Sequence, residues 1–315
     1  MNKRIEWIDV AKAILIFLVM LGHSPIPKWE CNAINSFHMA AFFSLSGFTF
    51  SYKGNFKEFI LKKTRGILLP YIEFSVILLI FFFLKYRFIH SGNFDIIEGI
   101  KSIVIPISGR QTASVYGLWF LPCLFLAETV IALCMYLCDR LNKYIGYITG
   151  VVVLLICCLL YAYNHVASII SVLPIAIFFS LFGFIIKSKI ITASHSSSII
   201  YVLSVFALII CIWLNTVKFA NDVDMSSMCL GFIPLYICCG IVGSLSTICV
   251  SQYLTKIPYI QMVGRDSLYV YGLHYVIISL VDKVLLGVEC AIVTLLLTLP
   301  LVMLFKKFRS LSKYL

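Results

Sequence analysis

Apolar segments of near-membrane length recur along this chain, and they constrain its fold more than any other feature. Of its 315 residues, 61% are hydrophobic and only 12% are charged, and the mean hydropathy is +1.01. An apolar run of about 20 residues spans a bilayer as an α-helix, because a helix satisfies its own backbone hydrogen bonds in lipid. The sequence therefore predicts an all-α, polytopic membrane protein.

We predict a bundle of ten transmembrane helices, of which the seventh and ninth are short. The predicted spans are residues 8–24, 34–52, 67–88, 117–138, 145–162, 169–186, 199–214, 229–249, 265–281 and 289–305. An even number puts both termini on one side. With the N-terminus inside, the inner segments hold 17 Lys and Arg and the outer segments hold 7. Because basic residues gather on the cytoplasmic side, this asymmetry predicts that both termini are cytoplasmic.

The longest predicted connection, from about residue 89 to residue 116, is too short to form a soluble domain. Residues 1–315 are therefore expected to form a single transmembrane domain. Within the connection, Ile96, Ile100, Ile103 and Ile107 recur at helical spacing. This pattern is typical of an amphipathic helix that lies along the membrane surface. It is compatible both with a lid over an outward-facing site and with a plain surface loop.

The charged residues and cysteines exclude several classes of protein. The formal net charge is +11, but the basic residues sit in short connections between apolar runs, where they set topology, so we do not expect nucleic-acid binding. Eleven of the twelve cysteines fall within apolar runs or at their ends, and no CxxC with partner histidines occurs. The pattern supports neither a metal site nor a disulfide framework. Lys12 interrupts the first apolar run, which is therefore interpreted as an uncleaved span rather than a signal peptide.

The first span carries three polar residues, Asp9, Lys12 and His23. Ionisable groups in lipid are costly, so they normally face a bundle interior or a wet cavity. Asp9 and Lys12 are three positions apart and share a helix face. Lys12 and His23 differ by about 20° of rotation and roughly 16 Å of rise. The stripe therefore places a cation near mid-depth and an imidazole near one end. A buried ion pair with an interfacial histidine is the plainer alternative.

His38 begins the second predicted span, at a depth similar to that of His23. Two imidazoles at one level would line one cavity, although a histidine at a helix start is also a common interfacial residue. Farther along the span, Ser44, Ser46 and Gly47 form a small-residue face, which is typical of close helix packing in membranes.

A basic cluster follows the second span and comprises Lys53, Lys57, Lys62, Lys63 and Arg65. Topology explains part of it, since basic residues anchor the cytoplasmic ends of helices. Lys62 and Arg65 are three positions apart at a helix entrance, a spacing that also suits a phosphate clamp. Both interpretations remain open from this segment alone.

Two further ionisable residues fall inside predicted spans. Glu128 lies near mid-depth of the fourth span, and an intramembrane carboxylate needs a partner. Lys12 is a candidate for that partner, because its predicted depth is similar. His274 lies past the middle of the ninth span. We interpret Glu128 and His274 as supporting groups.

The segments IDVAKAILIFLVMLGH, SFHMAAFFSLSGF, KKTRGILLPY, LWFLPCLFLAE and GRDSLYVYGLHY, in this order, resemble the acyltransferase-3 family of integral membrane acyltransferases. The family's first-helix pattern, a basic residue and a histidine with ten residues between them, falls on Lys12 and His23. Its basic pair after the second helix falls on Lys62 and Arg65. Many members have Arg where this chain has Lys12, and Lys does not form the same bidentate fork.

The resemblance implies transfer of an acyl group, often acetyl, from cytoplasmic acyl-CoA to a hydroxyl of a glycan or lipid-linked saccharide. On this basis we expect His23 to act as the general base, because an imidazole titrates near neutral pH. His38 would orient His23 or the substrate, and Lys12, held by Asp9 or Glu128, would steady charge in the path of the donor. The phosphates of CoA would be bound by the basic residues Lys62, Lys63 and Arg65.

The expected setting is the plasma membrane, with acetyl-CoA or another short acyl-CoA as donor and no metal. A transporter or flippase that exports a glycan or its precursor is the main alternative, since ten helices and a basic inner face suit it too. Against it, the sequence shows no paired broken helices and no internal symmetry of the kind many transporters have. A non-enzymatic membrane sensor has little support.

Overall fold

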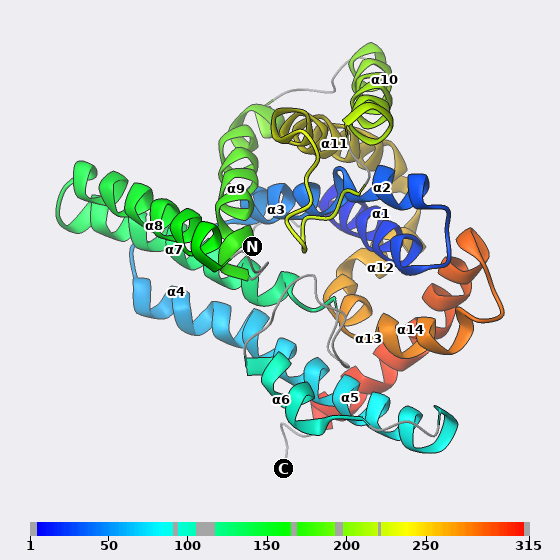
Figure 1. Cartoon of the computed structure of the whole chain (residues 1–315). Helices are drawn as coiled ribbons and strands as arrows, with labels where there is room; N and C mark the ends of the chain where they lie inside the picture. The colour runs from blue at the N-terminus through cyan, green and yellow to red at the C-terminus, as the bar shows by residue number, and fades with distance from the viewer. Residues whose placement is uncertain are drawn as a thin grey trace. The chain divides into compact units, whose positions relative to one another are not determined.

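The computed structural model describes residues 5–90, 94–104, 117–164, 169–192, 198–219 and 222–311, and Figure 1 shows their helices. These residues are helical apart from their connections and one isolated bridge between Asp224 and Cys229. The chain divides into two compact units. The first unit comprises residues 1–42, 195–223 and 231–315, and the second comprises residues 43–194 and 224–230.

The first unit is organised around α1 (Glu6–His23), which packs against five other α-helices of the unit. Half of its residues are buried, including Val10, Leu15 and Met20, whose side chains have no exposed surface. The other helices that lie wholly in this unit are α2 (Lys28–Asn35), α10 (Ser198–Trp213), η3 (Leu214–Phe219), α11 (Ile233–Tyr253), η4 (Leu254–Lys256), α12 (Pro258–Arg265), α13 (Ser267–Val281) and α14 (Gly287–Leu311). The α-helices in contact with α1 are α2, α11, α12, α13 and α14.

A glycine brings α12 into backbone contact with α1. A Cβ atom built on Gly264 would collide with the carbonyl oxygen, carbonyl carbon and Cα of Asp9. No side chain fits there, so the two backbones touch at this point. The contact fixes the carboxyl end of α12 against the first turns of α1.

Contacts at the two ends of α14 set the direction of the neighbouring helices. The Gly287 amide, at the start of α14, donates to the Pro25 carbonyl just beyond the end of α1, at 3.0 Å. At the other end of α14, Lys306 forms an ion pair with Asp266 at 2.7 Å. Asp266 directly precedes α13 and follows α12, whose end packs on Asp9. Helices α1 and α13 therefore run in one direction and α14 runs in the other.

The second unit contains a long continuous helix made of four pieces, a short helix and three further long helices. These elements are α4 (Phe56–Lys63), η1 (Thr64–Leu68), α5 (Leu69–Lys85), η2 (Tyr86–His90), α6 (Ile96–Val104), α7 (Phe120–Arg140), α8 (Lys143–Asn164) and α9 (Ile169–Thr192). Helix α3 (His38–Thr49) begins in the first unit and ends in this one.

Small residues let α3 and α9 pack at backbone distance. A Cβ on Gly47 would collide with the backbone of Ser180, and a Cβ on Gly183 would collide with the backbone of Ser44. The two contacts are reciprocal. They confirm the prediction that Ser44 and Gly47 belong to a close-packing face.

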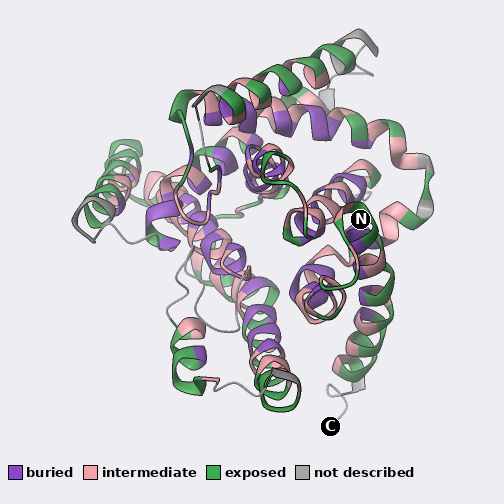
Figure 2. Cartoon of the chain, turned by 45° about the vertical axis from the view of Figure 1, so that its right-hand side comes forward, coloured by how far each residue is buried: buried purple, intermediate pink, exposed green. Residues whose placement is uncertain are grey.

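Six helices among the described residues are long and apolar enough to cross a membrane. They cover residues 56–88, 120–140, 143–160, 169–190, 233–253 and 287–310. Figure 2 shows exposed residues along these long helices, and on α8 they include Val151, Leu155 and Leu159. Apolar side chains that face outward along a whole helix are suited to contact with lipid. The chain is a membrane protein.

The predicted spans differ from the observed helices in two places. The second span, residues 34–52, is wrong as one helix, because α2 ends at Asn35 and α3 begins at His38. The third span was predicted to begin at residue 67. The observed helix begins earlier and runs without a break over residues 56–88. The short seventh and ninth spans correspond to the shorter apolar helices α10 and α13. Ten crossings and cytoplasmic termini remain predictions.

The amphipathic helix expected in the long connection is present as α6, with Ile97 and Ile100 exposed. The carbonyl of Ile103 accepts a hydrogen bond from the Tyr71 hydroxyl at 2.8 Å, which ties α6 to α5. Ile107, the last residue of the predicted pattern, lies outside the described residues. The position of α6 along a membrane surface remains a prediction.

Candidate active site

His23 is the last residue of α1, and the sequence after it ends the helix. Ser24 precedes Pro25, which disfavours helical backbone at Ser24, and Ser24 is extended with φ −77° and ψ 158°. Its hydroxyl donates to the Met20 carbonyl at 2.8 Å and its amide donates to the Leu21 carbonyl at 3.1 Å. The last turn is thus capped, and the side chain of His23 is exposed beside it.

Tyr275 of α13 contacts the His23 imidazole. Its hydroxyl oxygen lies 2.9 Å from Nε2 of His23 and 3.1 Å from Nδ1. The two ring centroids are 4.8 Å apart. A phenol hydroxyl both donates and accepts, so it can bond either ring nitrogen. Tyr275 is half-buried.

His274 and Tyr271 lie behind this pair and are both buried, with exposed fractions of 0% and 6%. The His274 ring stacks on His23 at 5.6 Å between centroids and lies 4.4 Å from the Tyr275 ring. Nδ1 of His274 lies 2.7 Å from the Tyr271 carbonyl oxygen. A carbonyl only accepts, so Nδ1 carries the proton. Nε2 therefore has the lone pair, and it has no hydrogen-bond partner among the described residues.

His38 is buried at the start of α3, with an exposed fraction of 7%. Its Nδ1 donates to the Ile34 carbonyl at 2.8 Å. His38 and His23 lie close enough for an electrostatic interaction between their rings. The first unit therefore brings together His23, His38 and His274, as the predicted depths suggested for the first two.

The other two residues of the polar stripe lie toward the opposite end of α1. Asp9 is buried, with an exposed fraction of 4%, and Lys12 is half-buried. A groove of about 260 Å³ also runs along α1, but its lining is apolar and includes neither Lys12 nor His23. It is formed by Ala13, Ile14, Phe17, Leu18, Ile260, Val263 and Leu295. This apolar groove therefore does not form a polar path between Lys12 and His23.

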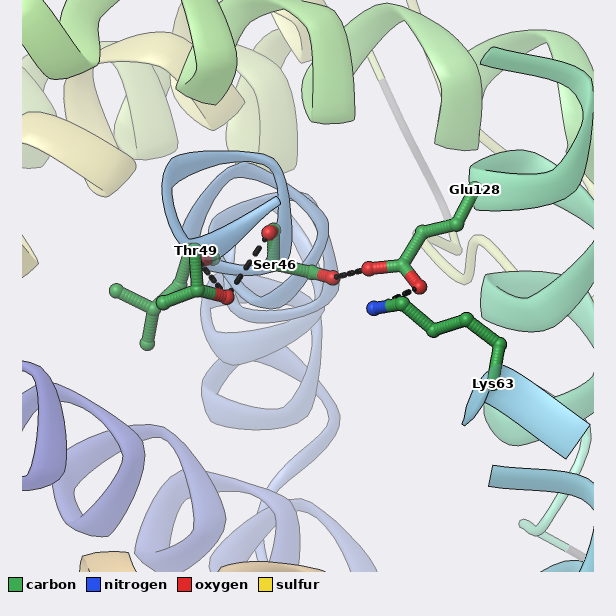
Figure 3. Close-up of polar contacts among 5 residues, drawn as sticks. Ser46, Thr49, Lys63 and Glu128 are labelled. Carbon is green, nitrogen blue, oxygen red and sulfur yellow. Dashed lines mark hydrogen bonds and ion pairs between the residues drawn. The ribbon is translucent and has the colours of Figure 1, made fainter. Parts of the chain in front are cut away.

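The buried carboxylate of the second unit is neutralised by Lys63. Glu128 of α7 has an exposed fraction of 1%, and its Oε2 lies 2.5 Å from Nζ of Lys63 on α4. Its Oε1 accepts from the Ser46 hydroxyl of α3 at 2.8 Å (Figure 3). Sequence reasoning assigned Lys63 to the CoA phosphates and suggested Lys12 as the partner of Glu128. The observed partner is Lys63.

Lys62 and Arg65, in contrast, are both exposed. Neither forms an ion pair with any residue in the described part of the chain. Directly after Lys63 the helix widens into the π-helical turn η1, which includes Arg65, and such turns are frequent at functional sites. The three CoA-phosphate candidates therefore separate into one lysine that holds a buried acid and two cations that remain available.

Sequence reasoning did not single out Tyr275 or the role of Ser46. Tyr275 directly follows His274 in the sequence GRDSLYVYGLHY. Its position beside a histidine in a predicted span was the sequence feature that could have identified it. Ser46 was interpreted only as a small packing residue. Its hydroxyl also donates a hydrogen bond to the buried Glu128 carboxylate.

Comparison with family models identifies the chain. The model described as "Acyltransferase domain" matches residues 5–306. The chain belongs to the acyltransferase-3 family. This member is an acyltransferase built on membrane-spanning helices. Comparisons with curated proteins and with solved structures found no match. The matched range includes both the cluster around His23 and the basic pair Lys62 and Arg65.

Proposed function

We propose that this acyltransferase moves a short acyl group, in the first instance acetyl, from acyl-CoA to a hydroxyl of a cell-surface or lipid-linked glycan, with His23 as general base. The observation that supports the proposal best is the placement of His23. It is an exposed imidazole at a capped helix end, held by a tyrosine hydroxyl, in a chain of an acyltransferase family. An imidazole nitrogen with a free lone pair is the group that most often takes a proton in general-base catalysis.

The proposed reaction is a single transfer. The acceptor hydroxyl oxygen attacks the thioester carbonyl carbon while His23 takes the hydroxyl proton. The carbon–sulfur bond then breaks, the acyl group remains on the acceptor oxygen as an ester, and the thiolate of CoA leaves. The proton held by the His23 imidazolium returns to the thiolate, so the base is regenerated and the products are the ester and free CoA.

The donor phosphates are proposed to bind at Lys62 and Arg65. Both side chains are exposed, and a guanidinium forms bidentate bonds to phosphate. Lys63 is assigned a different role, because its ammonium group already neutralises Glu128. It would hold α4 against α7 and so support the two phosphate ligands. The donor side is proposed to be the cytoplasm, in the plasma membrane, as the distribution of basic residues predicts.

The test uses purified protein in proteoliposomes with acetyl-CoA labelled in the acetyl group and a crude glycolipid fraction. We expect label in the glycolipid and release of free thiol, both lost in His23→Ala. His90→Ala, which changes a histidine of the second unit that has no assigned role, is the matched control. Glycan export without acyl transfer would contradict the proposal and support a transporter.

A further inference from the structure

We infer that Tyr275 is a positioning residue, whose hydroxyl sets the tautomer and the orientation of the His23 imidazole. This inference deepens the proposed function and rests on it. It starts from the contact between the two side chains, in which the Tyr275 hydroxyl lies 2.9 Å from Nε2 of His23. His23 ends α1 and Tyr275 lies in α13, so the contact joins two helices that are far apart in the sequence.

An exposed imidazole at a helix end needs such a contact to act as a base. It must present one lone pair toward the acceptor, and it turns freely about its side-chain bonds unless something holds it. If the Tyr275 hydroxyl accepts the N–H of one ring nitrogen, the other nitrogen carries the lone pair. The same contact persists when the ring gains a proton, because both nitrogens are then donors.

The buried layer behind Tyr275 explains why its hydroxyl is well placed. His274 is wholly buried, and its ring lies 4.4 Å from the Tyr275 ring. His274 is itself held by the 2.7 Å bond to the Tyr271 carbonyl. Tyr275 therefore stands against a fixed partner, and its hydroxyl reaches His23 from a constrained ring.

The unpartnered Nε2 of His274 is a second observation at this position. It carries a lone pair, is buried and has no hydrogen-bond partner among the described residues. A buried acceptor without a donor is costly. The His274 ring that carries this nitrogen lies against the rings of both His23 and Tyr275.

Kinetics of Tyr275→Phe form the first arm of the test, since this change removes the hydroxyl and keeps the ring. We expect kcat to fall about tenfold, the value of one hydrogen bond, while KM for acetyl-CoA stays unchanged. The acid limb of the pH–rate profile should move to lower pH, because the lost bond favoured the protonated ring. Tyr259→Phe, at a tyrosine that is 77% exposed, is the matched control and should change neither. An unchanged kcat and profile in Tyr275→Phe would overturn the inference.

Nitrogen-15 NMR of histidine-labelled protein forms the second arm and needs no activity. The His23 resonances are assigned by their loss in His23→Gln. We expect Tyr275→Phe to change the tautomer balance of His23 and its titration, and Tyr259→Phe to leave both as in the wild type. Identical His23 spectra in Tyr275→Phe and wild type would overturn the inference. If the spectra change but wild type and His23→Ala transfer acyl groups equally, Tyr275 still orients His23 and it is the proposed function that fails.

Discussion

Lys63 and Glu128 form an ion pair at 2.5 Å, and the two ends of the pair differ in burial. The Glu128 side chain has an exposed fraction of 2%, whereas that of Lys63 has 22%. The carboxylate is also bonded by the Ser46 hydroxyl, so α3, α4 and α7 meet at one acidic group. The pair therefore connects three helices of the second unit.

The burial of this pair predicts an asymmetric effect of mutation. Lys63→Ala should destabilise the protein by about 3 kcal/mol, because it leaves a buried carboxylate without a counter-charge. Glu128→Gln should cost less, since the Lys63 ammonium can reach solvent. Thermal unfolding in detergent measures both. The adjacent Lys62→Ala is the matched control and should leave stability unchanged, and an equal loss of stability in Lys62→Ala would contradict the assignment.

Lys62 and Arg65 should affect the binding of the donor rather than the chemical step. We expect Lys62→Ala and Arg65→Ala each to raise KM for acetyl-CoA by about tenfold or more, the value of a charge-assisted hydrogen bond. Neither should change KM for acetyl-pantetheine, which carries the thioester without the nucleotide phosphates. Steady-state kinetics with the two donors measure the difference. Equal effects on both donors would show that the pair does not bind phosphate.

Gly264 should be intolerant of any side chain. Gly264→Ala places a Cβ against the backbone of Asp9, and overpacking of this kind costs about 1–3 kcal/mol. We expect a lower unfolding temperature and a smaller yield of folded protein. The control is Gly66→Ala, because no atom lies within 4 Å of a Cβ at Gly66. A stable Gly264→Ala protein would contradict the close approach of α12 to α1.

The sequence predicted the features that depend on one segment at a time. Long apolar runs such as residues 169–186 gave helices near the expected positions, and the small residues Ser44 and Gly47 gave a close packing face. The break after Asn35 was missed, because residues 34–52 are apolar on average although Asn35, Ser36 and His38 are polar. Hydropathy measures the composition of a segment and is insensitive to a two-residue interruption.

Partners across helices could not be predicted in the same way. Lys63 and Lys62 are adjacent and chemically identical, and only the packing of α4 against α7 decides which of them meets Glu128. Tyr275 likewise looked like one of many aromatic residues in an apolar span. Its contact with His23 depends on α1 and α13 running in the same direction, which no local pattern reports.

The most direct test of the account is the rate of acyl transfer by His23→Ala, compared with wild type at equal amounts of folded, membrane-inserted protein. A general base contributes at least about 10²-fold, so we predict a fall in kcat of that size or more, with thermal stability retained because the side chain is exposed. A His23→Ala protein that transfers acyl groups at a near wild-type rate would contradict the account.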